Sequence, residues 1–348
     1  MSKKKEKKNI GKKIHELAKR LWPINRSITG EGVRKSLRIL KEIFPKLSIV
    51  EVKSGKKVFD WTIPQEWNVS EAWVKNSKNK KIIDFANNNL HLVGYSHPVK
   101  AEINLKKLKK HLYSLPDQPK AIPYVTSYYK KRWGFCISEK DKKKLKPGNY
   151  KVFINSKFKK GSLTYGEIII PGRTKKEIFL STNICHPSMA NNELSGPTVT
   201  VYLAKWIRSL KKRNFTYRIV FVPETIGSIT YLNKNYKKMK NNIYGGFNVV
   251  CVGDEKNYSY LPSRNGETIS DVIAKHVLSW TVKKYKTYTW LQRGSDERQY
   301  CSPGIDLPVV GFSRSKYGKY KEYHSSADNL KIISQKSLQE SLNVLINL

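Results

Sequence analysis

The sequence lacks several patterns that would define a function class. No apolar run reaches the roughly 18 to 20 residues needed to cross a bilayer, and no fixed-period repeat occurs. The 348 residues include only four cysteines, with no CxxC pair, which suits free thiols in a reducing cytosol better than a disulfide framework. The basic N-terminus is followed by neither an apolar segment nor a cleavage site, so it is not a secretory signal. We therefore expect a cytoplasmic protein without a membrane partner.

Acidic residues and arginine are also scarce. The chain has 27 acidic and 67 basic residues, a net charge of +40, yet only 13 of the basic residues are arginine and 54 are lysine. Arginine is the residue suited to bidentate phosphate and base contacts, and the lysines are spread along the whole chain. A solvated lysine surface is the favoured interpretation and polyanion binding the alternative. Nucleic acid is not expected as a partner beyond nonspecific charge attraction.

The chain is 39% hydrophobic, enough for a large core and more than one domain. Residues 10–45 have apolar residues at helical spacing, with breaks at a Trp-Pro pair and a Gly-Glu-Gly turn. Residues 58–160 are rich in aromatic, β-branched and proline residues, which predicts short antiparallel strands in a small β-rich unit. Residues 145–173 close that unit with a hairpin-like pattern.

After residue 165 the pattern alternates between strand, loop and helix. Such alternation predicts a largely parallel sheet covered by helices on both faces, with the ligand site beyond the carboxyl ends of the strands. The expected strands are GEIIIPG, EIFLSTNIC, YRIVFVPET, GFNVVCVGD and LPVVGFSRS, and the expected helices are SGPTVTVYLAKWIRSLKK, ETISDVIAKHVLSWTVKKY and SLQESLNVLINL.

Polar side chains follow four of these strands. They are His186, with Asn192 and Glu193 after it, then Glu224, Asp254 and His324. Each alone is a weak signal, because loop histidines are seldom ligands and carboxylates at strand ends often form turns or helix caps. Two histidines and several carboxylates from separate strands can converge on one point, as a borderline cation such as zinc requires.

The order of these residues resembles the zinc exopeptidases of the leucyl-aminopeptidase and glutaminyl-cyclase type. More closely, one bacterial family resembles nearly the whole chain: the aminopeptidase-like proteins of unknown substrate associated with polysaccharide biosynthesis. The motifs are LWPINRSITGEG, VFDWTIPQEWNV, IPYVTSYY, WGFC, GSLTYGE, CHPSMANNELSGP, PETIGSI and YHSSADN.

This resemblance implies a discontinuous zinc-exopeptidase-like α/β domain with a mixed, mostly parallel sheet over 1–57 and 160–348. A β-rich domain over 58–159 is then inserted into it. Relatives usually continue into a winged-helix-like C-terminal part, which this chain is expected to lack.

The resemblance also implies functional residues. His186, Asp254 and His324 become metal ligands, and Glu224 becomes the general base or a further ligand. Zinc would supply an activated water, and the expected substrate is a small amide or peptide-like molecule in glycan-precursor metabolism. A catalytically impaired binding or scaffold protein in polysaccharide assembly is the alternative, and homo-oligomerisation is left open.

Three departures from the zinc exopeptidases weaken a two-metal site. Asn192 stands where those enzymes have a bridging aspartate, Thr225 follows Glu224 where a second glutamate is usual, and Pro187-Ser188 replaces the x-Asp after the first histidine. An amide coordinates through oxygen but lacks the negative charge and the bridging geometry. We therefore expect at most one tightly bound zinc.

The candidate substrate-binding residues are Glu193, Arg264, Arg293 and Asp296. Glu193 could act in the site or serve as a helix-start carboxylate. The segment QRGSDERQYCSPG could read a substrate's amine or carboxylate or be a salt-linked loop, and Arg264 is a similar case. Cys185 is not expected to form a dyad with His186, because adjacent strand residues face opposite sides. The tryptophans at 61, 67, 73 and 133 are expected in the core of the insert, with sugar stacking as the alternative.

Overall fold

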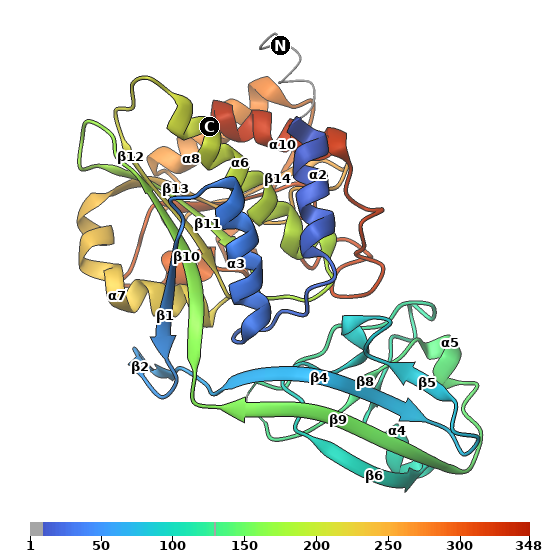
Figure 1. The fold of residues 1–348 in the computed structure, drawn as a ribbon. Coiled ribbons are helices and arrows are strands. Elements are labelled where there is room, and N and C mark those ends of the chain that lie inside the picture. Colours follow the sequence, from blue (N-terminus) through green and yellow to red (C-terminus); the bar gives the residue numbers. More distant parts are fainter. Residues whose placement is uncertain (1–9, 129) are drawn as a thin grey trace.

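A computed structural model describes residues 10–128 and 130–348; most of the lysine-rich start lies outside these ranges. The main body is an eight-stranded sheet in the order β1-β10-β12-β11-β13-β16-β14-β15 (Figure 1). The central strands β12, β11, β13 and β16 run parallel. β10 pairs antiparallel with both β1 and β12, and β14 pairs antiparallel with β16 but parallel with β15. The strands are β1 (Ser48–Lys53), β10 (Ser162–Ile170), β11 (Glu177–Asn183), β12 (Thr216–Val222), β13 (Ile243–Val249), β14 (Tyr258–Leu261), β15 (Tyr285–Thr287) and β16 (Val309–Ser313).

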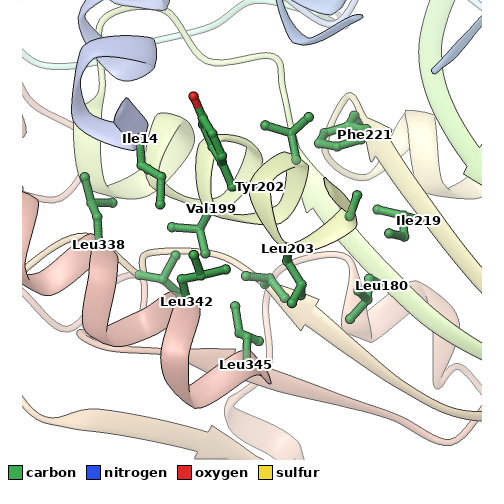
Figure 2. Packing of buried hydrophobic residues seen from close by; sticks show 14 of the residues in the cluster. Ile14, Leu180, Val199, Tyr202, Leu203, Ile219, Phe221, Leu338, Leu342 and Leu345 are labelled. Carbon is green, nitrogen blue, oxygen red and sulfur yellow. The ribbon is translucent and has the colours of Figure 1, made fainter. Parts of the chain in front are cut away.

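Helices cover both faces of this sheet, as the alternation predicted. One face carries α2 (Ile10–Leu21), α3 (Glu31–Ile43), α6 (Ser195–Ser209), α8 (Ile269–Thr281) and α10 (Gln335–Asn347), and the other carries α7 (Ile226–Asn242) and α9 (Glu297–Tyr300). Neighbouring strand residues point to opposite faces, so Leu180 packs under the first group and Phe179 under the second. Figure 2 shows the first core, where α6 packs between α2, α10 and the sheet. The predicted mixed, mostly parallel α/β fold is confirmed.

A second, four-stranded antiparallel sheet lies within the range predicted for the insert. Its strand order is β5-β4-β9-β6, and shorter elements complete the unit. The elements are β2 (Lys57–Val58), β3 (Trp61–Thr62), β4 (Glu66–Lys75), β5 (Lys81–Asp84), β6 (Val99–Asn104), α4 (Leu105–Lys109), β7 (Leu112–Tyr113), β8 (Phe135–Cys136), α5 (Glu139–Lys142) and β9 (Asn149–Lys159).

The hairpin-like pattern over 145–173 does not form a hairpin. β9 pairs with β4 and β6 in the second sheet, whereas β10 pairs with β1 and β12 in the first. The two strands are therefore consecutive members of different sheets and carry the chain from the insert back to the main body (Figure 1).

A buried ion pair joins the insert to the main body. Arg34 of α3 donates hydrogen bonds to both carboxylate oxygens of Glu66 in β4, at 2.6 and 3.0 Å. Burial disfavours the Glu66 carboxylate, but the bonds from Arg34, with others from Asn68 and the Ser162 amide, outweigh it and lower the pKa of Glu66 to about 2.

Within the described ranges, no helix is long and apolar enough to cross a membrane.

Candidate functional site

The candidate site is built on the carboxyl ends of the parallel strands, and His186 lies at its centre. The chain leaves β11 at Asn183, and the imidazole of His186 is 5% exposed. Arg26 donates from Nε to the His186 carbonyl at 3.0 Å and is itself 1% exposed. Arg26 was not among the predicted site residues, because it lies in the segment after α2, 160 residues from the histidine that it holds.

Glu193 orients His186. Its Oε2 lies 2.8 Å from His186 Nδ1, and its Oε1 accepts from the backbone amides of His186, at 2.8 Å, and Cys185. The π-helical turn Ala190–Leu194 before α6 points this side chain back toward the strand end. Glu193 is fully buried, so its contacts are those of a positioning residue and not of the predicted substrate-binding residue.

Glu224 faces the other nitrogen of the same ring. Its Oε2 lies 3.5 Å from His186 Nε2, while Oε1 accepts from Ser295 Oγ at 2.6 Å and Asn183 Nδ2 at 3.0 Å. Burial raises the pKa of Glu224, against the opposing effects of His186 and the Ser295 hydrogen bond. One oxygen is thus fixed by two donors while the other is left to exchange a proton, as a general base requires.

His324 brings a second imidazole to the site. Its ring centre lies 5.3 Å from that of His186, and its Nε2 is buried without a hydrogen-bond partner. Burial lowers the pKa of His324 to about 3, so the ring is neutral near pH 7. Tyr323 stacks on it with ring centres 3.9 Å apart. A neutral buried imidazole with a free nitrogen is the form that binds a metal.

The insert contributes Tyr124 to the site. The Tyr124 ring lies 4.9 Å from the ring of His186 and 5.1 Å from that of His324. Its backbone amide donates to the His324 carbonyl at 2.8 Å. The preceding residue, Pro123, forms an isolated antiparallel β-bridge with Ser325. The sequence offered the IPYVTSYY motif as a family feature without a role, and the structure places Tyr124 of this motif against both histidines of the site.

Asn192 is held through its backbone while its side chain stays available. Asp328 accepts from the amides of Asn191 at 2.7 Å and Asn192 at 3.0 Å. The Nδ2 of Asn192 lies 3.8 Å from Cys251 Sγ, and its Oδ1 is buried without a partner. Asp328 belongs to the YHSSADN motif, but nothing in its spacing predicted that it would hold a loop 136 residues earlier in the chain.

Asp254 is engaged elsewhere. Its Oδ1 accepts from Ser315 Oγ and the Lys256 amide, and its Oδ2 accepts from Asn191 Nδ2 and the Ser315 amide, all at 2.8 to 3.0 Å. These four hydrogen bonds hold the turn after β13 against its neighbours. The prediction that Asp254 binds a metal gains no support from them.

Cys185, His186 and Glu193 are a cluster in which one ligand atom from each lies within 4.8 Å of the others. The Cys185 sulfur lies 3.4 Å from His186 Nδ1, so the expectation that the two side chains diverge was wrong. Both residues lie beyond the end of β11, where the alternation of a strand no longer applies. Burial nevertheless raises the pKa of the Cys185 thiol to about 12, and Glu193 is already bonded to three groups, so this cluster is a poor metal site.

Backbone strain is concentrated around the same strand ends. Of eight described residues other than glycine with positive φ, four lie here, at Ser188, Thr225, Cys251 and His324. Such conformations cost roughly 1 to 3 kcal/mol each and tend to occur at functional sites. Glycine at position 196 avoids a steric clash, because a Cβ there would lie 2.3 Å from Thr182 Oγ1 and 2.5 Å from the Val249 carbonyl oxygen.

Of the three remaining candidate residues, Arg264 lies outside the site, and Asp296 and Arg293 lie beside it. Arg264 is exposed and pairs with Asp306. Asp296 is buried next to Glu224, where its Oδ1 accepts from the Thr225 amide at 2.7 Å and its Oδ2 has no partner. Arg293 is 8% exposed, and only its Nη2 has a hydrogen-bond partner, the Pro262 carbonyl at 2.8 Å.

The residues present offer donor atoms of the kinds that zinc binds. Ligating histidines usually donate their second ring nitrogen to a carboxylate, as His186 is placed to do toward Glu193. His324 Nε2 and Asn192 Oδ1 are buried and have no hydrogen-bond partner. These nitrogen and oxygen atoms are donor types suited to zinc, and the Glu224 carboxylate lies beside His186.

Comparisons with known proteins agree with this fold. A family model described as a domain of unknown function, DUF4910, matches residues 15–348. A Clostridium acetobutylicum protein, described as a candidate polysaccharide biosynthesis protein with an aminopeptidase-like domain, is 46% identical over 331 residues, covering 95% of this chain and 75% of the relative.

Two solved structures are also similar. The crystal structure of a candidate peptidase from Clostridium acetobutylicum superposes with a TM-score of 0.95 and 44% identity, covering 99% of this chain and 81% of that one. A zinc aminopeptidase from Bacillus subtilis superposes with a TM-score of 0.70 and 13% identity, covering 98% and 93%, which shows a shared fold alone. The chain therefore belongs to the DUF4910 family and shares its fold with a zinc aminopeptidase, as the sequence motifs predicted.

Proposed function

We propose that this protein is a single-zinc hydrolase that cleaves an amide bond of a small peptide-like substrate. The observation that carries the proposal is the environment of His186: Glu193 fixes one ring nitrogen at 2.8 Å, and the other faces Glu224 at 3.5 Å. His186 and His324 would hold the ion, with Asn192 Oδ1 as a neutral third donor. Bound zinc would supply a water with a pKa near 7.

The chain's own residues supply the proton transfer and the enclosure. Glu224 Oε2 is the free carboxylate oxygen beside His186, so it accepts the proton released when the substrate is attacked. Ser295 and Asn183 keep this carboxylate in place through Oε1. Tyr124, which the insert contributes, packs against both imidazole rings and shields that side of the site from water.

The substrate class and the location follow from a relative and from the cysteines. The C. acetobutylicum relative is described as a polysaccharide biosynthesis protein, which favours an amino-sugar or glycan-precursor amide as substrate. The four cysteines are all buried and unpaired, in keeping with a reducing cytoplasm. The Asn192 amide favours the alternative, a catalytically impaired binding or scaffold protein.

Metal content and hydrolysis together test the proposal. Mass spectrometry should find one zinc per chain, and aminoacyl anilides should be hydrolysed with zinc and not after chelation. Glu224→Gln should retain zinc and lose hydrolysis, His186→Ala and His324→Ala should lose zinc, and Glu267→Gln, an exposed control, should change neither. Two zinc equivalents at micromolar metal would overturn the single-metal design, and a zinc-free, inactive wild type would favour the scaffold alternative.

A further inference from the structure

Three neighbouring hydrogen-bond donors in the loop before α9 have no acceptor. They are Trp290 Nε1, Arg293 Nε and Arg293 Nη1, all buried. The Arg293 guanidinium lies 4.2 Å above the Trp290 ring, so the three N–H groups belong to one stacked pair of side chains. Buried N–H groups without an acceptor are rare in folded proteins, because each has lost its hydrogen bonds to water without a replacement.

The charge on this pair is only partly compensated. Within the described ranges Arg293 forms no ion pair, and its remaining hydrogen bond is to a backbone carbonyl, that of Pro262. Lys316 is a second buried cation, 5% exposed, with its Nζ 3.9 Å from the centre of the Tyr317 ring. The buried Glu297 carboxylate acts on both cations, but it accepts hydrogen bonds from Tyr317 and the Gly294 amide instead. Two buried cations beside one such carboxylate leave a positive charge that favours a further anion.

The loop is connected directly to the candidate base. The Gly294 amide donates to Tyr317 Oη at 2.6 Å, which places Arg293 beside the residue whose ring lies under Lys316. The next residue, Ser295, donates to Glu224 at 2.6 Å. A ligand held by Arg293 therefore lies two residues along the chain from the residue that fixes the Glu224 carboxylate.

We propose that Trp290 and Arg293, with Lys316 nearby, form a subsite for an oxyanion carried by the substrate, a carboxylate or a phosphate. The subsite rests on the proposed function for its role in catalysis, because it makes the scissile amide part of an anionic molecule. The chemistry favours an oxyanion over a neutral group, since all three orphan groups are donors and an oxyanion offers only acceptors. Nε and Nη1 lie on different edges of the guanidinium, and Nη2 is held by the Pro262 carbonyl, so each free N–H group can donate a single hydrogen bond to an oxyanion.

Binding of simple anions tests the subsite without any need for turnover. Inorganic phosphate and acetate would be titrated by calorimetry into the purified protein at constant ionic strength, with chloride as the background anion. We expect saturable binding of at least one of the two, and the tighter of them identifies the class. Arg293→Met should weaken it at least tenfold, while Arg298→Met, which removes the charge of an exposed arginine in α9, should leave it unchanged. Equal loss in both variants, or no saturable binding to the wild type, would overturn the subsite.

A second variant guards against misfolding. Trp290→Phe keeps the ring beneath Arg293 and removes one donor, so it should weaken anion binding several-fold with an unchanged melting temperature. Anion binding in a protein that hydrolyses nothing would leave the subsite standing and refute the hydrolase. Equal hydrolysis of neutral and anionic anilides by wild type and Arg293→Met would instead refute the subsite and leave the hydrolase standing.

Discussion

Replacing Glu193 by glutamine should disable His186 while leaving the fold in place. Glutamine has nearly the same shape, but only one of its two terminal atoms accepts hydrogen bonds. If its oxygen keeps the amides of Cys185 and His186, its NH₂ group faces His186 Nδ1 and requires an acceptor there. The ring must then carry its proton on Nε2, the nitrogen that the proposed zinc site needs free. If the amide flips, the NH₂ group faces two backbone donors instead.

The size of the effect follows from the contacts that are lost. Substituting the carboxylate behind a ligating histidine typically costs 10- to 100-fold in metal affinity or activity, or roughly 1.4 to 2.7 kcal/mol. Hydrogen bonds to a charged group contribute roughly 1.5 to 3 kcal/mol each, so the free energy of unfolding of the metal-free protein should fall by at least about that amount.

Two measurements check this expectation. Competition with a chromogenic chelator gives the zinc affinity, and urea unfolding of the chelated protein gives its stability. The same substitution at the exposed Glu267 is the matched control and should alter neither. Loss of stability with wild-type zinc affinity would refute the tautomer argument and move the metal away from His186.

Further substitutions test other contacts. Glu66→Gln should destabilise the protein by about 2 kcal/mol at pH 7, after allowance for solvent screening; because the folded pKa of about 2 lies below the usual 4.3, the difference from wild type should persist above pH 4.3 and vanish toward pH 2 in urea unfolding. Asp254→Asn places a donor among four donors, so it should lower the free energy of unfolding by about 1 to 3 kcal/mol with zinc stoichiometry unchanged; loss of zinc would make Asp254 a ligand after all. Tyr124→Ala should lower kcat/KM at least tenfold while Tyr124→Phe stays near wild type, and equal values for all three would exclude the insert from the site.

The fold was largely predictable because its strands and most of its helices have strong patterns. The central strands are short apolar runs with polar ends, which identify a parallel sheet. α7 was missed because lysine, asparagine and tyrosine dominate IGSITYLNKNYKKMKNN, and because its buried residues are mainly one consecutive run over 226–232 and not a stripe at helical spacing. The predicted hairpin of β9 with β10 was wrong because strand spacing alone does not say which of two sheets a strand joins.

Site residues were predictable where the strand itself places them and less so beyond it. His186 and Glu224 directly follow parallel strands, and the structure brings them together. Asp254 lies five residues after β13, past a positive φ at Cys251 that redirects the chain. Glu193 depended on a π-helical turn, a geometry that no residue pattern specifies. Arg26 and Asp328 act through backbone groups far away in sequence, and such contacts leave no local signal.

The surroundings of Asn192 bear on the number of metal ions. An aspartate there would offer two oxygens, but the amide offers one, and its Nδ2 is turned toward Cys251 Sγ at 3.8 Å. Burial raises the pKa of the Cys251 thiol well above its usual range, so the sulfur supplies no negative charge. Thr225 gives no carboxylate either, and its amide is bonded to Asp296. A second divalent cation would therefore have to share the one Asn192 oxygen with the first and would find only a neutral thiol beside it, whereas the first has two imidazoles. This asymmetry is the physical reason to expect one zinc.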